Sequence, residues 1–416
     1  MRRIFTSLAP NMEADDRRLA TRLLVTPWRW RTGESVGKLE RWFTDFTGAA
    51  VAKSFTSGRG SLYAILKSLH LPEGSEVLLQ AYTCVAVPDP VLWAKLQPVY
   101  VDCDESLTMA AADLEKKITP KSKVLIIQHT FGQPADMEKL MATAKKYNLF
   151  VIEDCAHALG GEYQGKKLGS FGDAAFFSFG RDKVLSAVFG GVAVMKAAAD
   201  GERLAHVHAS CALPTRSWVV QQLMHLPVLA VSKRLYDVLS LGKIKLELAK
   251  RLRIISRAVY PIEKSGGAPQ FVFWKMPEAS ARLALHQLEK LERFNAHRQV
   301  IADYYLKALG EFAVSGQAHR SGGIFLRYTV FHPKAHEVIR NAREQGVELG
   351  DWYTTPIAPK GVDYKAVGYI PGSCPMAELK ARETCNLPTH IGISLADAEY
   401  IVGMLKKYLY TWRLEK

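Results

Sequence analysis

Two stretches of the chain place an acid and a lysine where they could act together. One apolar run ends in Asp154, and a second ends at Ser178, five residues before Lys183. Two adjacent strands that end in this way can present both groups to one pocket. A lysine amine can form an imine with the aldehyde of pyridoxal phosphate (PLP), and an acid can keep the pyridine nitrogen of that cofactor protonated. The pair therefore favours PLP chemistry, although a strand-end Asp is more often a turn or cap residue and a loop lysine is usually just solvated.

A group of small residues supplies a possible phosphate site. The stretch 54–61, which reads Ser-Phe-Thr-Ser-Gly-Arg-Gly-Ser, opens a predicted helix over 60–70. Small residues at a helix start leave backbone N–H groups accessible, and the helix dipole favours an anion there. Ser57, Gly58, Arg59 and Ser178 are the candidate contacts for a phosphate. The alternative is an ordinary helix cap without a ligand.

The elements around these residues predict an α/β fold. From about residue 50 to 195, apolar strands alternate with helical stretches, which is typical of a mostly parallel sheet that is covered on both faces. Ligands bind such sheets at the carboxyl ends of the strands. The expected strands cover 76–80, 98–102, 123–128, 149–154, 174–179 and 191–195, and the expected helices cover 60–70, 88–96, 110–118 and 137–147.

The rest of the chain predicts four parts. We expect an N-terminal arm over 1–47, with an amphipathic helix that begins near Ser35, and a large domain made of 48–212 and 266–300. A basic, helical insert over 213–265 closes with the linker-like run Ser-Gly-Gly-Ala-Pro at 265–269. One long helix is predicted over 277–309, and a smaller C-terminal α+β domain over 301–416. In that domain we expect a strand at 324–331 and helices at 335–345 and 394–410.

Composition excludes several classes of protein. The chain has 416 residues, of which 48% are hydrophobic, so a sizeable core is expected. We find no apolar run of the ~18 residues that cross a bilayer and no secretory signal pattern. The six cysteines are scattered without a C-x-x-C pair, so we expect no metal site and no redox motif. A cytoplasmic location with reduced thiols is the resulting expectation.

Many motifs in one order carry a family resemblance. From about residue 34 to 408, interrupted by the basic insert, the chain resembles the DegT/DnrJ/EryC1/StrS family of fold-type-I PLP enzymes, most of which aminate sugar nucleotides. The matching stretches are Thr56-Ser-Gly, Ala81-Tyr-Thr, Val99-Tyr-Val-Asp, Gln128-His-Thr-Phe-Gly-Gln-Pro-Ala-Asp-Met, Ile152-Glu-Asp-Cys-Ala-His-Ala-Leu-Gly-Gly-Glu-Tyr, Gly169-Ser-Phe-Gly-Asp, Ser178-Phe with Lys183, Gly190-Gly, Lys275-Met, Gln287-Leu-Glu-Lys-Leu and Leu387-Pro-Thr-His.

The resemblance implies a fold and a set of roles. The fold is a large domain with a mostly parallel, seven-stranded type of sheet and a smaller C-terminal α+β domain. Lys183 is then the cofactor-binding lysine and general base, Asp154 the partner of the pyridine nitrogen, His157 a contact near the phenolic oxygen of the ring, and Ser178 a phosphate contact. Packing alone is the alternative for His157. Arg327 is a candidate carboxylate binder, with a structural arginine in a strand as the alternative.

The activity implied is amination in a homodimer. An amino acid, glutamate by resemblance, would supply the amino group to a keto sugar, most simply a nucleotide-linked one, in polysaccharide or secondary-metabolite biosynthesis. The alternatives are a PLP-dependent sugar dehydratase and a non-catalytic regulator that keeps the fold. The dehydratases of the family carry histidine in place of the lysine, so Lys183 favours amination.

The chain departs from the family pattern at four positions. Cys84 stands where an aromatic ring usually stacks on PLP, with Tyr82 as a possible substitute, and Arg59 stands where threonine is usual. Phe273 falls near an asparagine that reaches across the dimer interface in relatives, and Ala358 replaces a histidine near the sugar. The cofactor contacts therefore match the family better than the substrate contacts do.

The insert carries half of the excess positive charge. Of a formal net charge of +14, residues 213–265 contribute +7, from 10 Lys/Arg against 3 Asp/Glu. Apolar and basic residues alternate there as in helices that lie on an anionic membrane surface, which predicts a peripheral contact at the inner membrane face or a polyanionic substrate. The alternative is a helical excursion that covers the active site or extends the dimer. We expect no nucleic-acid partner, because no recognition motif is present.

Overall fold

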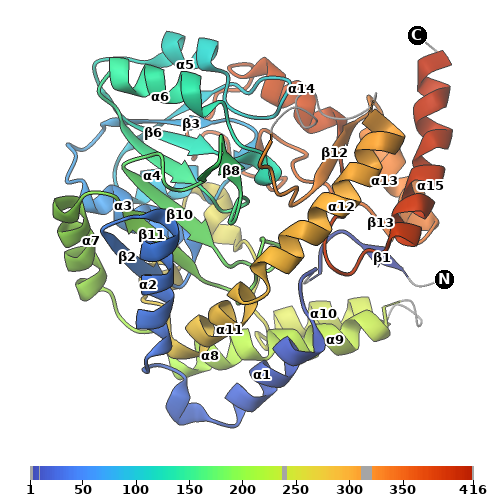
Figure 1. Ribbon diagram of the computed structural model, residues 1–416, viewed down its shortest axis with the longest axis horizontal. Helices are drawn as coiled ribbons and strands as arrows, with labels where there is room; N and C mark the ends of the chain where they lie inside the picture. The colour runs from blue at the N-terminus through green and yellow to red at the C-terminus, as the bar shows by residue number, and fades with distance from the viewer. Residues whose placement is uncertain (1–2, 9, 237–240, 311–320, 415–416) are drawn as a thin grey trace.

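A seven-stranded sheet forms the centre of the molecule (Figure 1). The computed structural model describes residues 3–8, 10–236, 241–310 and 321–414, with the side chains of 409–414 left aside. The strand order is β2-β11-β10-β7-β6-β3-β5, and only β11 runs antiparallel to its neighbours. The strands are β2 (Val51–Phe55), β3 (Glu76–Gln80), β5 (Gln97–Val101), β6 (Ser122–Gln128), β7 (Phe150–Asp154), β10 (Ala174–Ser178) and β11 (Gly191–Met195).

Alternation along the strands explains why both faces of this sheet are covered. In β6, Val124 belongs to one hydrophobic cluster and Leu125 to another on the opposite face. Successive strand side chains point to opposite faces, so an apolar strand needs helices on both. The covering helices are α2 (Ser35–Thr47), α3 (Gly58–Ser68), α4 (Pro88–Trp93), α5 (Ala111–Lys117), α6 (Met137–Lys146), α7 (Ala198–Ser210) and α11 (Glu278–Leu288).

The expected α/β architecture is confirmed, with three local differences. Strand β2 was not expected, and the strand expected at 324–331 is ordered as β12 only over Tyr328–Phe331. Phe325 has φ +48°, which takes the backbone out of the extended region before β12 begins. The helix expected over 277–309 is two helices, α11 and α12 (Leu291–Leu309).

The break between α11 and α12 has a local and a tertiary cause. The N–H of Lys290 donates to the carbonyl of Gln287 at 3.0 Å, which closes α11 with a tighter turn. The ammonium of Lys290 lies against Asp15 and Asp16 of the N-terminal arm, at 2.7 and 3.0 Å. Both helices bury apolar side chains, so the apolar spacing continues across the break and indicates a single helix.

A second core lies in the C-terminal part of the chain. It is built from the end of α12, the antiparallel pair β12 and β15 (Thr384–Leu387), α13 (Ala335–Glu344) and α15 (Leu395–Leu414). The N-terminal strand β1 (Ile4–Phe5) pairs with β13 (Val347–Glu348). Strand β1 and helix α15 therefore both contribute to this core, while the exact division into domains stays a prediction.

The insert is helical, as expected from its sequence. It contains α8 (Arg216–Leu223), α9 (His225–Arg234) and α10 (Leu241–Arg251), followed by a 3-10 turn at Pro261–Ser265. Helices α9 and α10 pack together, and α1 (Ala14–Leu24) lies beside α8 and α9 at the lower edge of the molecule in Figure 1. Within the described residues, we find no helix that is long and apolar enough to cross a membrane.

Candidate active site

A cavity of about 710 Å³ opens at the carboxyl ends of the parallel strands. Asp154 is the last residue of β7 and Ser178 the last residue of β10, and these two strands are neighbours in the sheet. Ser57 follows β2 at the same edge. All eight residues that the sequence predicts for the site line this one cavity: Ser57, Gly58, Arg59, Cys84, Asp154, His157, Ser178 and Lys183.

The first turn of α3 forms a cradle at one end of the cavity. Ser57 is the helix cap, and its Oγ accepts a hydrogen bond from the N–H of Gly60 at 3.1 Å. A Cβ on Gly58 would lie 2.8 Å from Cβ of Ser178, and a Cβ on Gly191 would lie 2.5 Å from the Gly58 nitrogen. The turn is therefore pressed against β10 and β11. The N–H groups of a first turn have no partner inside the helix, so the cradle suits an anion such as phosphate.

Arg59 points from this cradle toward the insert. Its guanidinium pairs with the fully buried carboxylate of Glu263, and its second terminal nitrogen donates to the carbonyl of Ala258 at 2.7 Å. The guanidinium still borders the cavity. Its predicted contact with a phosphate stays a prediction, because both terminal nitrogens already have partners on the insert.

Lys183 meets His157 inside the cavity. Lys183 Nζ lies 2.8 Å from Nε2 of His157, and the backbone N–H of Phe131 donates to the other ring nitrogen at 3.3 Å. A neutral ring that accepts at Nδ1 carries its proton on Nε2, which then donates toward the lysine amine. Burial lowers the pKa of Lys183 and, together with the charges of Lys183 and Arg327, holds the pKa of His157 well below its usual value.

Asp154 faces the same space with little compensation for its charge. Its Oδ1 accepts a hydrogen bond from the N–H of Ala156 at 2.9 Å. Burial raises the pKa of this carboxyl, while the Ala156 N–H and the charge of Lys183 lower it. A buried carboxylate is stabilised by an opposite charge at close range. A protonated pyridine nitrogen supplies such a charge, so the acid, the lysine and the cradle fit PLP.

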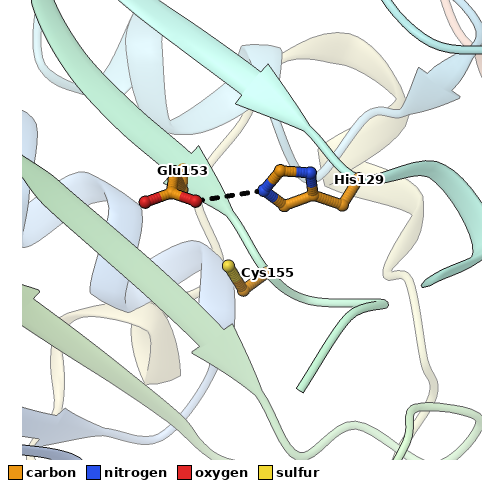
Figure 2. A group of neighbouring side chains, drawn as sticks. All are labelled: His129, Glu153 and Cys155. Carbon is orange, nitrogen blue, oxygen red and sulfur yellow. Dashed lines mark hydrogen bonds and ion pairs between the residues drawn. The ribbon is translucent and has the colours of Figure 1, made fainter. Parts of the chain in front are cut away.

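Glu153 points to the other side of β7, away from the cavity. Figure 2 shows its carboxylate beside His129, with an Oε2–Nε2 distance of 3.2 Å, and Cys155 nearby. The same carboxylate accepts three backbone N–H bonds from the loop 169–172, at 2.7 to 2.9 Å. The donor atoms of the three side chains lie within 4.8 Å of one another. They do not suit a metal ion, because the carboxylate is already saturated and burial raises the pKa of the Cys155 thiol well above its usual value.

Cys84, which stands where the family usually has a PLP-stacking aromatic ring, borders the cavity. Cys84 and Ala358 are paired in register between β4 (Thr83–Cys84) and β14 (Ile357–Ala358), and both line the cavity. Tyr82 does not take the place of the ring, since it is fully buried and its hydroxyl bonds Thr384 at 2.8 Å. Phe273 packs against Tyr63, with ring centroids 5.0 Å apart.

Trp352 is a cavity residue that our sequence reasoning missed. Its ring stacks on His157, with centroids 5.6 Å apart and an interplanar angle of 17°. Lys183 Nζ lies 5.3 Å from the ring centroid, and the buried Arg327 guanidinium lies 4.2 Å from it. Arg327 thus packs on the Trp352 ring, and its predicted contact with a substrate carboxylate stays a prediction. The available signal was that Trp352 directly precedes the run Tyr353-Thr-Thr-Pro-Ile, which leads into the departing residue Ala358.

The insert forms a wall of the cavity. Arg181, two residues before Lys183, donates to the carbonyl and the hydroxyl of Ser256 at 2.6 and 2.5 Å. Sequence reasoning considered a segment that covers the active site but named none of the insert residues that do so. The insert residues that line the cavity are His225, Leu229, Leu246, Glu247, Lys250, Ile255, Arg257, Ala258 and Val259.

The sheet and the cavity together define the class of the protein as a PLP-dependent enzyme of fold type I. The chain belongs to the DegT/DnrJ/EryC1/StrS aminotransferase family, whose model matches residues 10–259 and 271–406. The match begins earlier than the resemblance suggested. It also runs through residues 213–259, so the expected interruption by the whole insert is wrong, and the gap in the match covers only 260–270. The protein is accordingly a PLP-dependent aminotransferase of a family that acts on sugars.

The chain is similar to two proteins named GDP-perosamine synthase and to the solved structure of an aminotransferase. The chain is 27% identical to GDP-perosamine synthase of Caulobacter vibrioides over 413 residues, which cover 96% of this chain and 97% of that protein. It is 34% identical to GDP-perosamine synthase of Escherichia coli O157:H7 over 186 residues, or 44% of this chain and only about half (51%) of that relative. The X-ray structure of the aminotransferase from Psychrobacter cryohalolentis superimposes with a TM-score of 0.75 at 19% identity, over 97% of this chain and 98% of that one.

Proposed function

We propose that this enzyme transfers an amino group from an amino acid to a keto sugar that is linked to a nucleotide. One observation carries the proposal: Lys183, Asp154 and the first turn of α3 converge on a single cavity. Two relatives named GDP-perosamine synthase support a sugar nucleotide as the acceptor. Glutamate is the proposed donor, by kinship with the family.

Each cofactor contact has a proposed role that follows from its geometry. Ser57, Gly58 and Ser178 hold the phosphate at the start of α3, where the backbone N–H groups and the helix dipole favour an anion. Asp154 keeps a proton on the pyridine nitrogen. The cofactor, when bound, supplies an electron sink for the bonds around the reacting carbon. Lys183 Nζ is the amine that holds the cofactor.

Lys183 also moves protons in the proposed reaction. A lysine with its ordinary pKa of ~10.4 is a poor base near neutral pH. Burial lowers the pKa of Lys183, so more of the amine is free to accept a proton from the substrate carbon. The Nε2–H of His157 orients Nζ, and the Trp352 ring covers the side of His157 on which it stacks. These two neighbours hold the amine and exclude water from one side.

We propose a homodimer in the cytoplasm, with a peripheral contact to the inner membrane face through residues 213–265. The dimer follows from the family, and the Phe273 position removes one cross-subunit contact that relatives use. Cys84 and Ala358 both line the cavity, and compared with the family pattern they remove an aromatic ring beside the cofactor and a histidine near the sugar. The choice of sugar is therefore expected to differ from that of relatives with the usual residues.

A sugar dehydratase and a regulator without turnover remain alternative functions. The retained Lys183, 2.8 Å from His157, favours transamination over dehydration. Release of a keto product or ammonia without an acceptor would indicate the dehydratase. Failure of any substrate to change the spectrum of bound cofactor would indicate the regulator.

The proposed function is tested by the absorbance of the PLP-loaded protein before and after addition of glutamate. For the natural chain we expect the band of lysine-bound cofactor to disappear with glutamate. For Lys183→Ala we expect no such response, with transamination lowered by about 10²–10⁴-fold or more. A band that ignores glutamate contradicts the proposed donor, and the absence of any band after PLP is supplied contradicts the whole proposal.

A further inference from the structure

Helix α10 of the insert, together with Leu252 just after its last residue, exposes a row of large apolar side chains. Leu241, Ile244, Leu248 and Leu252 are each 46% to 60% exposed. Their spacing of three, four and four residues places them within an arc of about 80° at 100° per residue. A row of this kind along one side of a helix indicates a binding surface for another protein or for a membrane.

Positive side chains border this row on both sides. At helical spacing, Lys245 lies next to one edge of the row and Arg251 next to the other. Arg253, just after the helix, adds one more exposed cation, and Glu247 is the single acid of α10. Lys243 lies on the far side of the helix, with its ammonium 5.0 Å from the ring centroid of Tyr236. The row is therefore an apolar stripe with a cation at each edge, and we name the four apolar residues of the preceding paragraph the α10 stripe.

The other sides of α10 are already occupied. Leu246 and Ala249 are buried against the rest of the insert, which includes Leu229 and Ile255. Leu246 and Lys250 line the active-site cavity. The α10 stripe thus points away from both the core of the insert and the cavity, and it has no catalytic part to play.

The positive charges beside the α10 stripe favour an anionic bilayer over a second copy of the chain as its partner. In a twofold contact between copies, the same patch faces itself, so the basic flanks of one α10 would oppose those of the other. An anionic bilayer attracts these cations and accepts the leucines into its apolar boundary. No described helix is able to span a membrane, so such a contact lies on the surface.

We infer that the α10 stripe seats on an anionic lipid bilayer, with Lys245 and Arg251 among the head groups. This inference deepens the proposed peripheral contact and rests on that part of the proposed function, but not on amination. Because Leu246 and Lys250 belong to the same helix, docking brings the insert wall of the cavity within about 10 Å, one helix diameter, of the bilayer. Acceptors that are held at a membrane would then meet the cavity without leaving the surface.

The test is flotation of the full-length, PLP-loaded protein with vesicles of phosphatidylglycerol and phosphatidylcholine. We expect the natural chain to float with these vesicles, less at high salt, and to remain at the bottom with pure phosphatidylcholine. Ile244→Gln with Leu248→Gln should lower the bound fraction at least tenfold. Val300→Gln with Ile370→Gln, at exposed apolar positions elsewhere, should leave it unchanged.

Three results overturn the inference; the stripe variant is Ile244→Gln with Leu248→Gln. The first is a natural chain that stays at the bottom, and the second is a stripe variant that floats as well as the natural chain. The third is a stripe variant that changes from dimer to monomer by light scattering while vesicle binding is absent, which would make the stripe a contact between copies. The glutamate response of the cofactor band should be the same in the natural chain and the stripe variant, so failure of docking and failure of the proposed amination are distinguishable.

Discussion

At the scale of single residues, the two acids that end β7 show how one position changes the role of a carboxylate. Glu153 and Asp154 are adjacent, so their side chains point to opposite faces of the sheet. Glu153 is saturated by backbone N–H groups and His129, whereas Asp154 faces the cavity with one backbone N–H as its hydrogen-bond donor. The first is suited to hold a loop, and the second to meet a positive ligand.

Asp89 is another buried acid, and it gives a prediction for pH-dependent stability. Neither of its carboxylate oxygens has a hydrogen-bond partner among the described residues. Burial raises its pKa to about 8, although the charge of Arg59 lowers it. The folded protein therefore holds this proton more tightly than the unfolded chain, so stability is lost as the pH rises from about 4 to about 8.

We expect Asp89→Asn to remove this loss, because an amide does not ionise. The variant should be more stable than the natural chain by on the order of 1–3 kcal/mol at pH 8 and by much less at pH 5. Thermal unfolding across that pH range measures the difference. Asp45→Asn, at an exposed position, is the matched control and should shift neither value. A variant that is less stable than the natural chain at pH 8 would contradict the raised pKa of Asp89.

At the scale of elements, the insert is fastened to the active site by two arginines. Arg59 comes from the first turn of α3 and pairs with Glu263, and Arg181 comes from the loop of Lys183 and binds Ser256. Both partners lie near the end of the insert. The position of this segment and the position of the cofactor contacts are therefore linked, which explains why the insert forms part of the cavity wall.

We expect Glu263→Gln to loosen this link. Removal of one member of a buried ion pair leaves an uncompensated charge, which costs about 3 kcal/mol in the free energy of unfolding. Denaturant unfolding of the PLP-loaded protein measures this cost. Glu162→Gln, which breaks the exposed pair with Lys167, should change stability little. Equal stability of the Glu263 variant and the natural chain would show that Arg59 finds another partner and that the Arg59–Glu263 ion pair does not stabilise the fold.

At the scale of the whole molecule, the cavity joins parts of the chain that lie far apart in the sequence. Its wall includes strand ends of the large sheet, Trp352 and Ala358 from the C-terminal part, and Ser7 from the arm. A ligand in this space contacts all of them. The bound cofactor should thus stabilise the folded chain as well as take part in the reaction.

We expect removal of PLP to lower the unfolding temperature of the entire protein. Free PLP at a hundred times its dissociation constant should stabilise the folded state by about 2.7 kcal/mol. Calorimetry with and without PLP checks this, and the shift should be smaller for Lys183→Ala, which lacks the amine that holds the cofactor. If PLP raised the unfolding temperature of only one part of the chain, the cofactor would not stabilise the whole molecule and the prediction would be wrong.

The sequence by itself determined the sheet and the residues that gather at its edge. Apolar strands alternating with helices require a covered parallel sheet, and the carboxyl ends of parallel strands meet at one edge. Asp154, Ser178 and Ser57 could therefore be placed together before any coordinates, because each lies at the end of a strand or the start of a helix. The short spacing after Ser178 added Lys183, and the family motifs added the role of His157.

Only the tertiary structure decided which distant parts complete the site. Three contacts join residues that lie far apart in the chain: Trp352 stacks on His157, Arg59 pairs with Glu263, and Lys290 at the helix break pairs with Asp16. Local spacing reports which side of an element is apolar, but not which other element covers it. Those contacts are chosen by the packing of whole elements, where shape and buried charge must be satisfied together.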